Sequence, residues 1–248
     1  MLGSVKDRIR ATPWLYDILM RAKRRMSGPD RVYDFFDPIS RAAQGKLQFV
    51  QIGANDGLRN DPIREFVVRD RWNGVFVEPL PDVFELLKRN YAYLGNANLK
   101  FVNAAIATSG ETDLTFYTFD EDFLNQLPME GRLKYLRKSS FDKEHVLRWL
   151  GPAEQSRVKE LRVPCLSMQT IFEKHCGGRD VDLLVCDAEG YDSKIIQSID
   201  YDRFHPKVIF FESHNVKAEK LQLFEFLNGK GYDTNEIGGD TAAVRRVN

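Results

Sequence analysis

Three apolar runs, each followed by glycines or carboxylates, carry the most informative residues of this sequence. They are residues 49–57 (FVQIGANDG), 74–79 (GVFVEP) and 181–190 (VDLLVCDAEG). Short apolar runs with these boundaries are typical of buried strands. Ligands of open α/β sheets bind beyond the carboxyl ends of the strands. The pattern therefore predicts a site for an adenosine-type cofactor at that edge of a sheet.

The first run ends in two glycines four residues apart, Gly53 and Gly57. The dinucleotide fingerprint G-x-G-x-x-G is not met, because Asn55 and Leu58 stand at its second and third glycine positions. The chemistry still suits a cofactor, since glycine lets the backbone approach a ligand closely and turn with positive φ. Asn tolerates that conformation better than most residues, and a following helix N-terminus can hold a carboxylate. A tight turn without a ligand is the alternative.

The second run ends in Glu78, at the end of the next predicted strand after the glycine turn. A carboxylate in this place can accept hydrogen bonds from the hydroxyls of a ribose. We interpret Glu78 and the glycine turn together as parts of a nucleoside-cofactor site. The alternative for Glu78 is an exposed acid before Pro79.

Further acids and a histidine follow two later strands and could move a proton. Asp187 and Glu189 follow the third run, and Glu212 and His214 follow the next strand. Histidine titrates near neutral pH, and carboxylates are common general bases. Oxygen ligands from Asp187, Glu212 and Asn215 would also suit Mg²⁺, an alternative that we do not favour. A histidine that only caps a strand end is the structural alternative for His214.

The elements that must position these residues alternate between strands and helices. Strands are predicted at 47–52, 74–77, 99–105, 112–118, 162–166, 182–187 and 207–212. Helices are predicted at 62–71, 81–94, 169–175, 193–199 and 218–230. Two last strands, 232–237 and 242–247, form a hairpin. The alternation predicts an α/β fold with a doubly wound parallel sheet, to which the hairpin adds an antiparallel strand.

Two segments depart from this alternation. Residues 1–45 are expected to form a helical appendage before the main domain of residues 46–248, and an irregular, charged insertion occupies about 119–160. Insertions over an active edge commonly select the substrate. The appendage carries apolar residues at helical spacing from Trp14 to Leu19, followed by a basic run that ends at Arg25. We expect a helix packed on the main domain with a solvated basic end; contact with an acidic partner or a membrane surface is the alternative.

Composition and charge exclude several classes of protein. The 248 residues hold 36 Lys and Arg and 36 Asp and Glu; a nucleic-acid binder usually shows a basic excess, so no nucleic-acid partner is expected. Three cysteines without paired spacing indicate a reducing compartment. No apolar run approaches the roughly 18 residues of a membrane span, and charges interrupt the region where a signal peptide would be apolar. We expect a cytoplasmic location.

With these residues in place, the chain resembles the FkbM-type S-adenosylmethionine-dependent methyltransferases. The matching stretches are residues 50–57 (VQIGANDG), 77–79 (VEP), 103–105 (NAA), 187–192 (DAEGYD), 206–212 (PKVIFFE) and 240–243 (DTAA). The resemblance covers about residues 46–248. It implies a Rossmann-like class I methyltransferase fold, whose seven-stranded, mostly parallel sheet ends in an antiparallel hairpin. One departure is Gln51, where many members of the family carry Asp or Glu.

The resemblance also implies where S-adenosylmethionine binds. The glycine turn would line its methionine end, Glu78 would take the ribose hydroxyls, and Asp187 would lie near the amino group and the transferred methyl. The implied cofactor contacts are Gln51, Gly53, Asn55, Asp56, Gly57, Glu78, Pro79, Asn103, Ala104 and Asp187.

Methyl transfer needs an aligned and deprotonated acceptor oxygen, for which we assign Asp187, Glu189 and His214 as the catalytic residues. Part of the insertion resembles a stretch that family members place near the acceptor pocket. The expected acceptor contacts are Ser140, Phe141, His145 and Tyr191. A helix cap at Ser140 is a compatible structural role.

The expected activity is O-methylation of a saccharide or related natural product, as in polysaccharide biosynthesis; this substrate class comes from the resemblance alone. The basic run at 132–138 would suit an anionic acceptor. An NAD-dependent oxidoreductase is one rival, and the missing G-x-G-x-x-G argues against it. The other rival is a non-catalytic Rossmann-like interaction module, whose acids need not share a pocket with the glycine turn.

Overall fold

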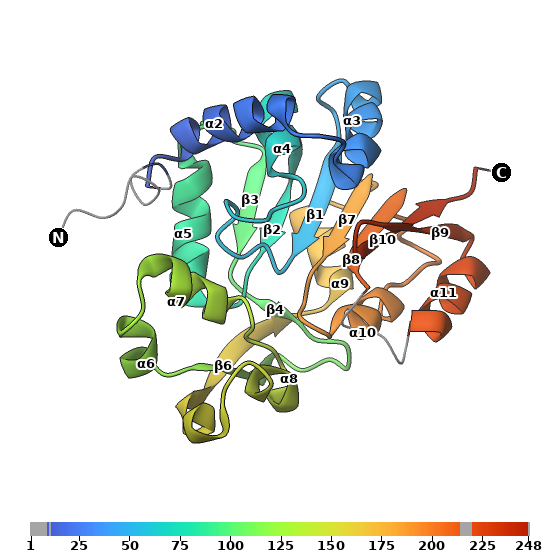
Figure 1. The fold of residues 1–248 in the computed structure, drawn as a ribbon. Coiled ribbons are helices and arrows are strands. Elements are labelled where there is room, and N and C mark those ends of the chain that lie inside the picture. Colours follow the sequence, from blue (N-terminus) through green and yellow to red (C-terminus); the bar gives the residue numbers. More distant parts are fainter. Residues whose placement is uncertain (1–8, 10, 214–219, 248) are drawn as a thin grey trace.

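A mostly parallel sheet of seven strands forms the centre of the computed structural model, which describes residues 9, 11–213 and 220–247 (Figure 1). The strand order is β3-β2-β1-β7-β8-β10-β9. The strands are β1 (Gln48–Ile52), β2 (Asn73–Val77), β3 (Leu99–Val102), β7 (Leu183–Cys186), β8 (Val208–Glu212), β9 (Tyr232–Ile237) and β10 (Asp240–Arg245). The strand β10 runs antiparallel to both of its neighbours, β8 and β9. The predicted sheet with a terminal antiparallel hairpin is confirmed.

Alternating side chains of the central strands build one core on each face of the sheet. Successive residues of a strand point to opposite faces, so Phe49 and Val50 of β1 belong to different cores. The Phe49 face is covered by α3 (Arg31–Ala43), α4 (Arg64–Asp70) and α5 (Pro81–Ala92). The Val50 face is covered by α9 (Met168–Thr170), η2 (Ile171–His175), α10 (Asp192–Gln197) and α11 (Lys220–Gly229). Helix α3 lies in the predicted appendage, yet its Phe36 is fully buried in the core on the Phe49 face of the sheet.

A second, three-stranded sheet stands beside the main one, in the order β4-β6-β5. Its strands are β4 (Ala105–Ile106), β5 (Asp113–Phe119) and β6 (Val158–Leu166). The single strand expected over 99–105 is therefore wrong, because the chain leaves the main sheet after Val102. The strands expected at 112–118 and 162–166 do form, but they pair antiparallel with each other. Local alternation of strands and helices does not say which strands share a sheet.

The insertion folds into short helices between β5 and β6. They are α6 (Glu121–Asn125), α7 (Met129–Leu136), α8 (Lys143–Leu147) and the 3₁₀ helix η1 (Pro152–Arg157). Their apolar side chains form a third core with the second sheet and with Leu80 and Val83 of the main domain. A backbone bridge between Tyr117 and Ser140 ties the insertion to β5. Helix α8 is capped by Asp142 and not by Ser140, which corrects the cap expected from the sequence.

The remaining helix, α2 (Pro13–Met26), packs against α4. No helix within the described residues has the length and apolar character that a bilayer crossing requires.

Candidate active site

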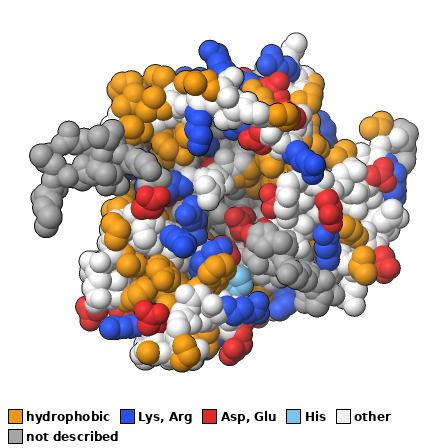
Figure 2. Space-filling view, in the orientation of Figure 1, with side chains coloured by type: hydrophobic (Ala, Val, Ile, Leu, Met, Phe, Trp, Pro, Cys, Tyr) orange, Lys and Arg blue, Asp and Glu red, His pale blue; other side chains and the backbone are white. Residues whose placement is uncertain are grey.

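The carboxyl edge of the main sheet is hollowed, and two adjoining cavities lie there. In the space-filling view, acidic and basic side chains flank a hollow near the middle of the face shown (Figure 2). Five residues line both cavities and so mark their junction: Gly53, Asn55, Arg137, Asp187 and Glu189.

The glycine turn after β1 presses against the end of β7. Gly53 has φ +72°, and a Cβ there would lie 1.8 Å from the backbone oxygen of Asp187. Only glycine fits so close an approach at this φ. Asn55 also adopts a left-handed conformation, with φ +50°. The turn is thus a packed element of the cavity wall, built by the backbone geometry for which glycine and Asn were expected.

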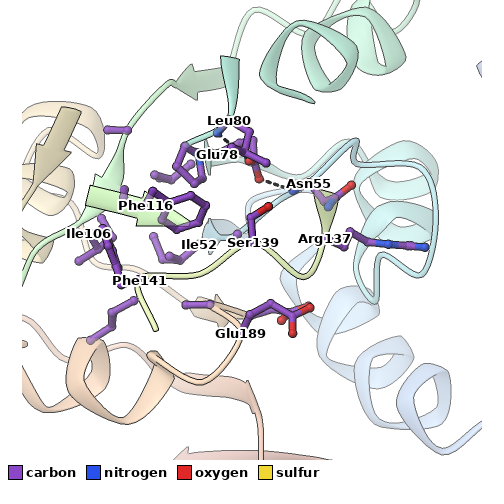
Figure 3. Close-up of a pocket in the computed structure, with 18 of the residues that line it drawn as sticks. Ile52, Asn55, Glu78, Leu80, Ile106, Phe116, Arg137, Ser139, Phe141 and Glu189 are labelled. Carbon is purple, nitrogen blue, oxygen red and sulfur yellow. Dashed lines mark hydrogen bonds between the residues drawn. The ribbon is translucent and has the colours of Figure 1, made fainter. Parts of the chain in front are cut away.

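Glu78 is buried beneath this turn, so the exposed acid considered from the sequence is not what the structure contains. One carboxylate oxygen accepts from the Asn55 backbone N–H at 2.9 Å, and the other accepts from the Leu80 N–H at 2.9 Å (Figure 3). Burial raises the pKa of Glu78 to about 7, while these two hydrogen bonds oppose the rise. Glu78 lines the first cavity, and the two backbone hydrogen bonds fix the orientation of its carboxyl group.

The first cavity has an apolar end and a polar end. Ile106, Phe116 and Phe141 lie on one side in Figure 3, and Asn55 and Arg137 lie on the other. Its empty space, counting the part open to solvent, is about 650 Å³, which lies within the usual range for small-molecule sites. An apolar end beside the buried carboxyl group of Glu78 would suit the base of a nucleoside.

The second cavity lies over β1, β7 and β8 and is more polar. Its empty space is about 1160 Å³, again including the part open to solvent. Four cations line it, of which Arg137 also lines the first cavity; the other three are Arg59, Lys134 and Lys138. The wall also contains Gln51, a predicted cofactor contact whose buried side-chain oxygen has no partner.

Asp187 stands at the junction of the two cavities, directly after β7. Although the residue is open to the cavities, the protein atoms packed around its carboxyl raise its pKa well above the ordinary value. Negative charges of Asp192, Glu212 and Glu189 raise this pKa further, and Lys138 opposes them. A carboxyl group that holds its proton more tightly is a better general base at neutral pH.

Glu189, the second predicted base, is engaged by two side chains of the insertion. Its carboxylate lies 3.0 Å from Lys138 Nζ and 3.0 Å from His145 Nε2. His145 is buried and contacts Glu189. Its expected contact with an acceptor remains a prediction. Ser140 Oγ donates to the backbone oxygen of Glu189 at 3.1 Å. The insertion is therefore fastened to the strand end that carries both acids.

Several predicted contacts lie behind the cavity walls. Asp56 is buried, accepts from the Leu58 and Arg59 N–H groups and pairs with the Arg59 side chain, which orders the turn. A Cβ on Gly57 would meet Leu87 and Tyr91, so this glycine serves packing against α5.

Asn103 and Tyr191 likewise stand outside both linings. Asn103 Nδ2 donates to the backbone oxygens of Glu78 and Pro79. The Tyr191 ring lies 5.2 Å from that of Phe141, centroid to centroid. Of the other predicted contacts, Pro79, Ala104 and Phe141 line the first cavity.

His214 and Asn215 lie outside the described residues. Within the described part of the chain, no group of three or more His, Cys, Asp or Glu side chains is placed to hold a metal ion.

Arg137 is a site residue that the sequence reasoning did not single out. It lines both cavities, and its Nη1 is buried without a hydrogen-bond partner. The basic run at 132–138 is visible in the sequence, but its neighbours have other tasks: Lys138 pairs with Glu189, and Arg132 lies near Asp82 and Glu121. Among the described residues, Arg137 is the only cation that lines both cavities, and only the fold reveals this.

The family model of the methyltransferase FkbM domain matches residues 51–234 of this chain. Among curated proteins, none matches. Three solved structures illustrate the likeness among folds. Precorrin-6y C5,15-methyltransferase from Geobacter metallireducens is 13% identical with TM-score 0.41, over 84% of this chain and 87% of that one.

An RNA methyltransferase from Salinibacter ruber, in complex with S-adenosyl-L-homocysteine, is 13% identical with TM-score 0.40, over 90% of this chain and 95% of that one. A methyltransferase from Geobacter sulfurreducens is 12% identical with TM-score 0.43, over 100% of this chain and 93% of that one. Similarity at this level does not identify the reaction or the acceptor of this chain.

Proposed function

This chain belongs to the FkbM methyltransferase family, and from that premise we propose that it transfers a methyl group from S-adenosylmethionine to a hydroxyl oxygen. The observation that carries the proposal is the junction of the two cavities. One cavity has the features of a nucleoside site, the other is open and polar, and Asp187 lies where they meet.

The residues of the first cavity suit the parts of the cofactor. The apolar side chains Ile106, Phe116 and Phe141 would contact the adenine, and Glu78 would accept from the ribose hydroxyls. The backbone of the turn at Gly53 allows close approach of the methionine portion. Arg137 brings an unpartnered guanidinium nitrogen to this end, which suits the carboxylate of the methionine portion. When bound, the cofactor supplies an electrophilic methyl group.

The second cavity would receive the acceptor. Asp187 would take the proton of the acceptor hydroxyl, and its raised pKa supports that task at neutral pH. Asp187 and Glu189 share a pocket with the glycine turn, which the rival reading as an interaction module does not require. The saccharide class of the acceptor rests on the family resemblance, because the second cavity is lined by cations and carboxylates alike and favours no charge on the acceptor.

Calorimetry with the purified chain tests the cofactor first. We expect S-adenosylmethionine and S-adenosylhomocysteine to bind with micromolar affinity, and NAD not to bind. Glu78→Ala should weaken both interactions, whereas Glu85→Ala, an exposed change on α5, should leave them unaltered. Absence of binding by folded wild-type protein would overturn the proposal, and binding of NAD would redirect it to the oxidoreductase.

The acceptor is tested separately with a panel of neutral and phosphorylated saccharides and labelled cofactor. Transfer of label to oxygen, mapped by mass spectrometry and NMR, supports O-methylation. Transfer to carbon or nitrogen, or to RNA only, would contradict it.

A further inference from the structure

Helix α2 turns its charged face toward the protein. Asp17, Arg21 and Arg24 recur at i, i+4 and i+7, a spacing that places them on one face of a helix. Asp17 is buried against Arg64 of α4. Arg24 pairs with Glu65, which is also on α4, at 2.6 Å. The helix does pack on the main domain, as the sequence predicts, but through these charged residues, and it leaves several of its apolar side chains exposed.

The buried contact fixes this orientation. Arg64 Nε lies 2.7 Å from one oxygen of Asp17, and Arg64 Nη2 lies 3.0 Å from the other. Arg64 Nη1 also donates to the backbone oxygen of Gly57 at 2.6 Å, so the same guanidinium joins α2 to the turn beside the active site. Rolling α2 to bury its apolar stripe would leave Arg64 charged, buried and unpaired, which is strongly unfavourable.

The face turned to solvent is apolar. Trp14, Ile18, Leu19 and Met26 are 51%, 55%, 42% and 89% exposed. With Met20, α2 holds five of the ten large apolar side chains that are exposed among the described residues. Figure 2 shows hydrophobic side chains gathered along the position that α2 has in Figure 1. Such a concentration on one short helix marks a surface that binds something.

The charges on this surface have one sign. Lys23 and Arg25 are exposed beside the apolar face, and neither forms an ion pair within the described part of the chain. The only carboxylate of α2, Asp17, is buried on the inner face. Lys and Arg beside a Trp-containing apolar face are typical of helices that lie in the interfacial layer of a membrane, and anionic lipids attract such cations.

We propose that α2 docks flat on an anionic lipid surface, with its outward apolar side chains in the interfacial layer and Lys23 and Arg25 at the head groups. A second copy of the chain fits this face less well, because a symmetric contact would bring its own cations together. The proposal is independent of the proposed methyl transfer.

Flotation of the full chain with vesicles tests the proposal. The chain should bind vesicles of phosphatidylglycerol and phosphatidylcholine about tenfold or more tightly than vesicles of phosphatidylcholine alone, and added salt should weaken this binding. The double change Trp14→Gln with Ile18→Gln should reduce binding about tenfold, as should Lys23→Gln with Arg25→Gln. Trp149→Gln, which alters a Trp that is 45% exposed in the insertion, is the matched control and should have no effect.

Each contrary result is informative because the substituted side chains are exposed and folding can be verified by circular dichroism. No binding to anionic vesicles, or binding that the Trp14 and Ile18 changes leave unaltered, would overturn the proposal. A concentration-dependent dimer in sedimentation velocity that these changes abolish would assign the face to a second copy. Retained binding of S-adenosylhomocysteine by the variants would separate any loss of lipid binding from damage to the active site.

Discussion

The carboxylate of Glu78 accepts a hydrogen bond from the backbone N–H of Asn55 at 2.9 Å. This contact joins the end of β2 to the glycine turn after β1, and so it couples the acid to the conformation of the turn. The positive φ of Asn55 turns its backbone N–H toward the Glu78 carboxylate. Cofactor affinity should therefore depend both on the charge of Glu78 and on the shape of the turn.

The charge of Glu78 should make cofactor binding depend on pH. Its pKa is about 7 in the free protein, and ribose hydroxyls that donate to the carboxylate would lower it in the complex. Binding then releases a proton, so affinity for S-adenosylhomocysteine should rise with pH up to about 7 and level off above it, by at most about tenfold per pH unit.

Calorimetry in buffers of different ionisation enthalpy measures that proton directly. Glu78→Gln should bind roughly tenfold to a hundredfold more weakly at pH 8 and lose the pH dependence. The pH range of about 5.5 to 8 extends roughly 1.5 units below and 1 unit above the pKa of Glu78. A wild-type affinity that does not change over this range would contradict the role of Glu78.

Arg137 should recognise the carboxylate of the cofactor. Arg137→Gln is expected to weaken binding of S-adenosylhomocysteine roughly tenfold to a hundredfold, because a charge-assisted hydrogen bond is lost. Binding of 5′-methylthioadenosine, which lacks the amino acid portion, should change little. Arg132→Gln alters a cation of α7, the helix that ends just before Arg137; Arg132 lies outside both linings, so this variant serves as the control. Equal weakening of both ligands would show that Arg137 shapes the cavity without contacting the carboxylate.

Gly53 should be intolerant of any side chain. Gly53→Ala places a Cβ 1.8 Å from the Asp187 backbone oxygen, so the turn must move and cofactor binding should be lost. Gly95→Ala imposes a similar left-handed strain, at φ +56°, in open space, and should cost only about 1–2 kcal/mol of stability. Urea unfolding and calorimetry of the two variants separate steric overlap from backbone strain; similar losses in both would refute the steric account.

Asp187 should be the group that takes the acceptor proton. Asp187→Asn is expected to lower kcat about 10²–10⁴-fold. Because the wild-type pKa is raised, the rate should fall on the acidic side well above the ordinary range of an aspartate. Glu189→Gln should cost less, since that carboxylate is already paired with Lys138 and His145. A larger loss for Glu189→Gln in a pH–rate series would transfer the role to Glu189.

The pair between Asp17 and Arg64 should be important for stability. Asp17→Asn leaves Arg64, whose side chain is 4% exposed, without its counter-ion, and should reduce the free energy of unfolding by about 3–5 kcal/mol. Glu65→Gln removes one of the two carboxylate partners of the more exposed Arg24, whose pair with Asp30 remains, and should cost about 1 kcal/mol or less. Thermal unfolding measures both, and equal shifts in Tm would argue against a special role of the buried pair.

Local patterns in the sequence were sufficient to predict most elements of the main sheet and the sheet edge at which the two cavities lie. Apolar runs of strand length precede Gly53, Glu78 and Asp187, and the geometry of parallel sheets brings such strand ends to one edge. The left-handed turn was equally readable, because few residues other than glycine and Asn adopt it.

Contacts between distant segments were decided by the tertiary structure alone. The pairing of β5 with β6, the attachment of Lys138 and His145 to Glu189, and the position of Arg137 at the junction all join segments far apart in the chain. The apolar stripe of α2 shows the limit most clearly. Periodicity reveals that a helix has two faces, but which face is buried depends on the partner, and here the partner offers Arg64, a buried charge that only the Asp17 face can neutralise.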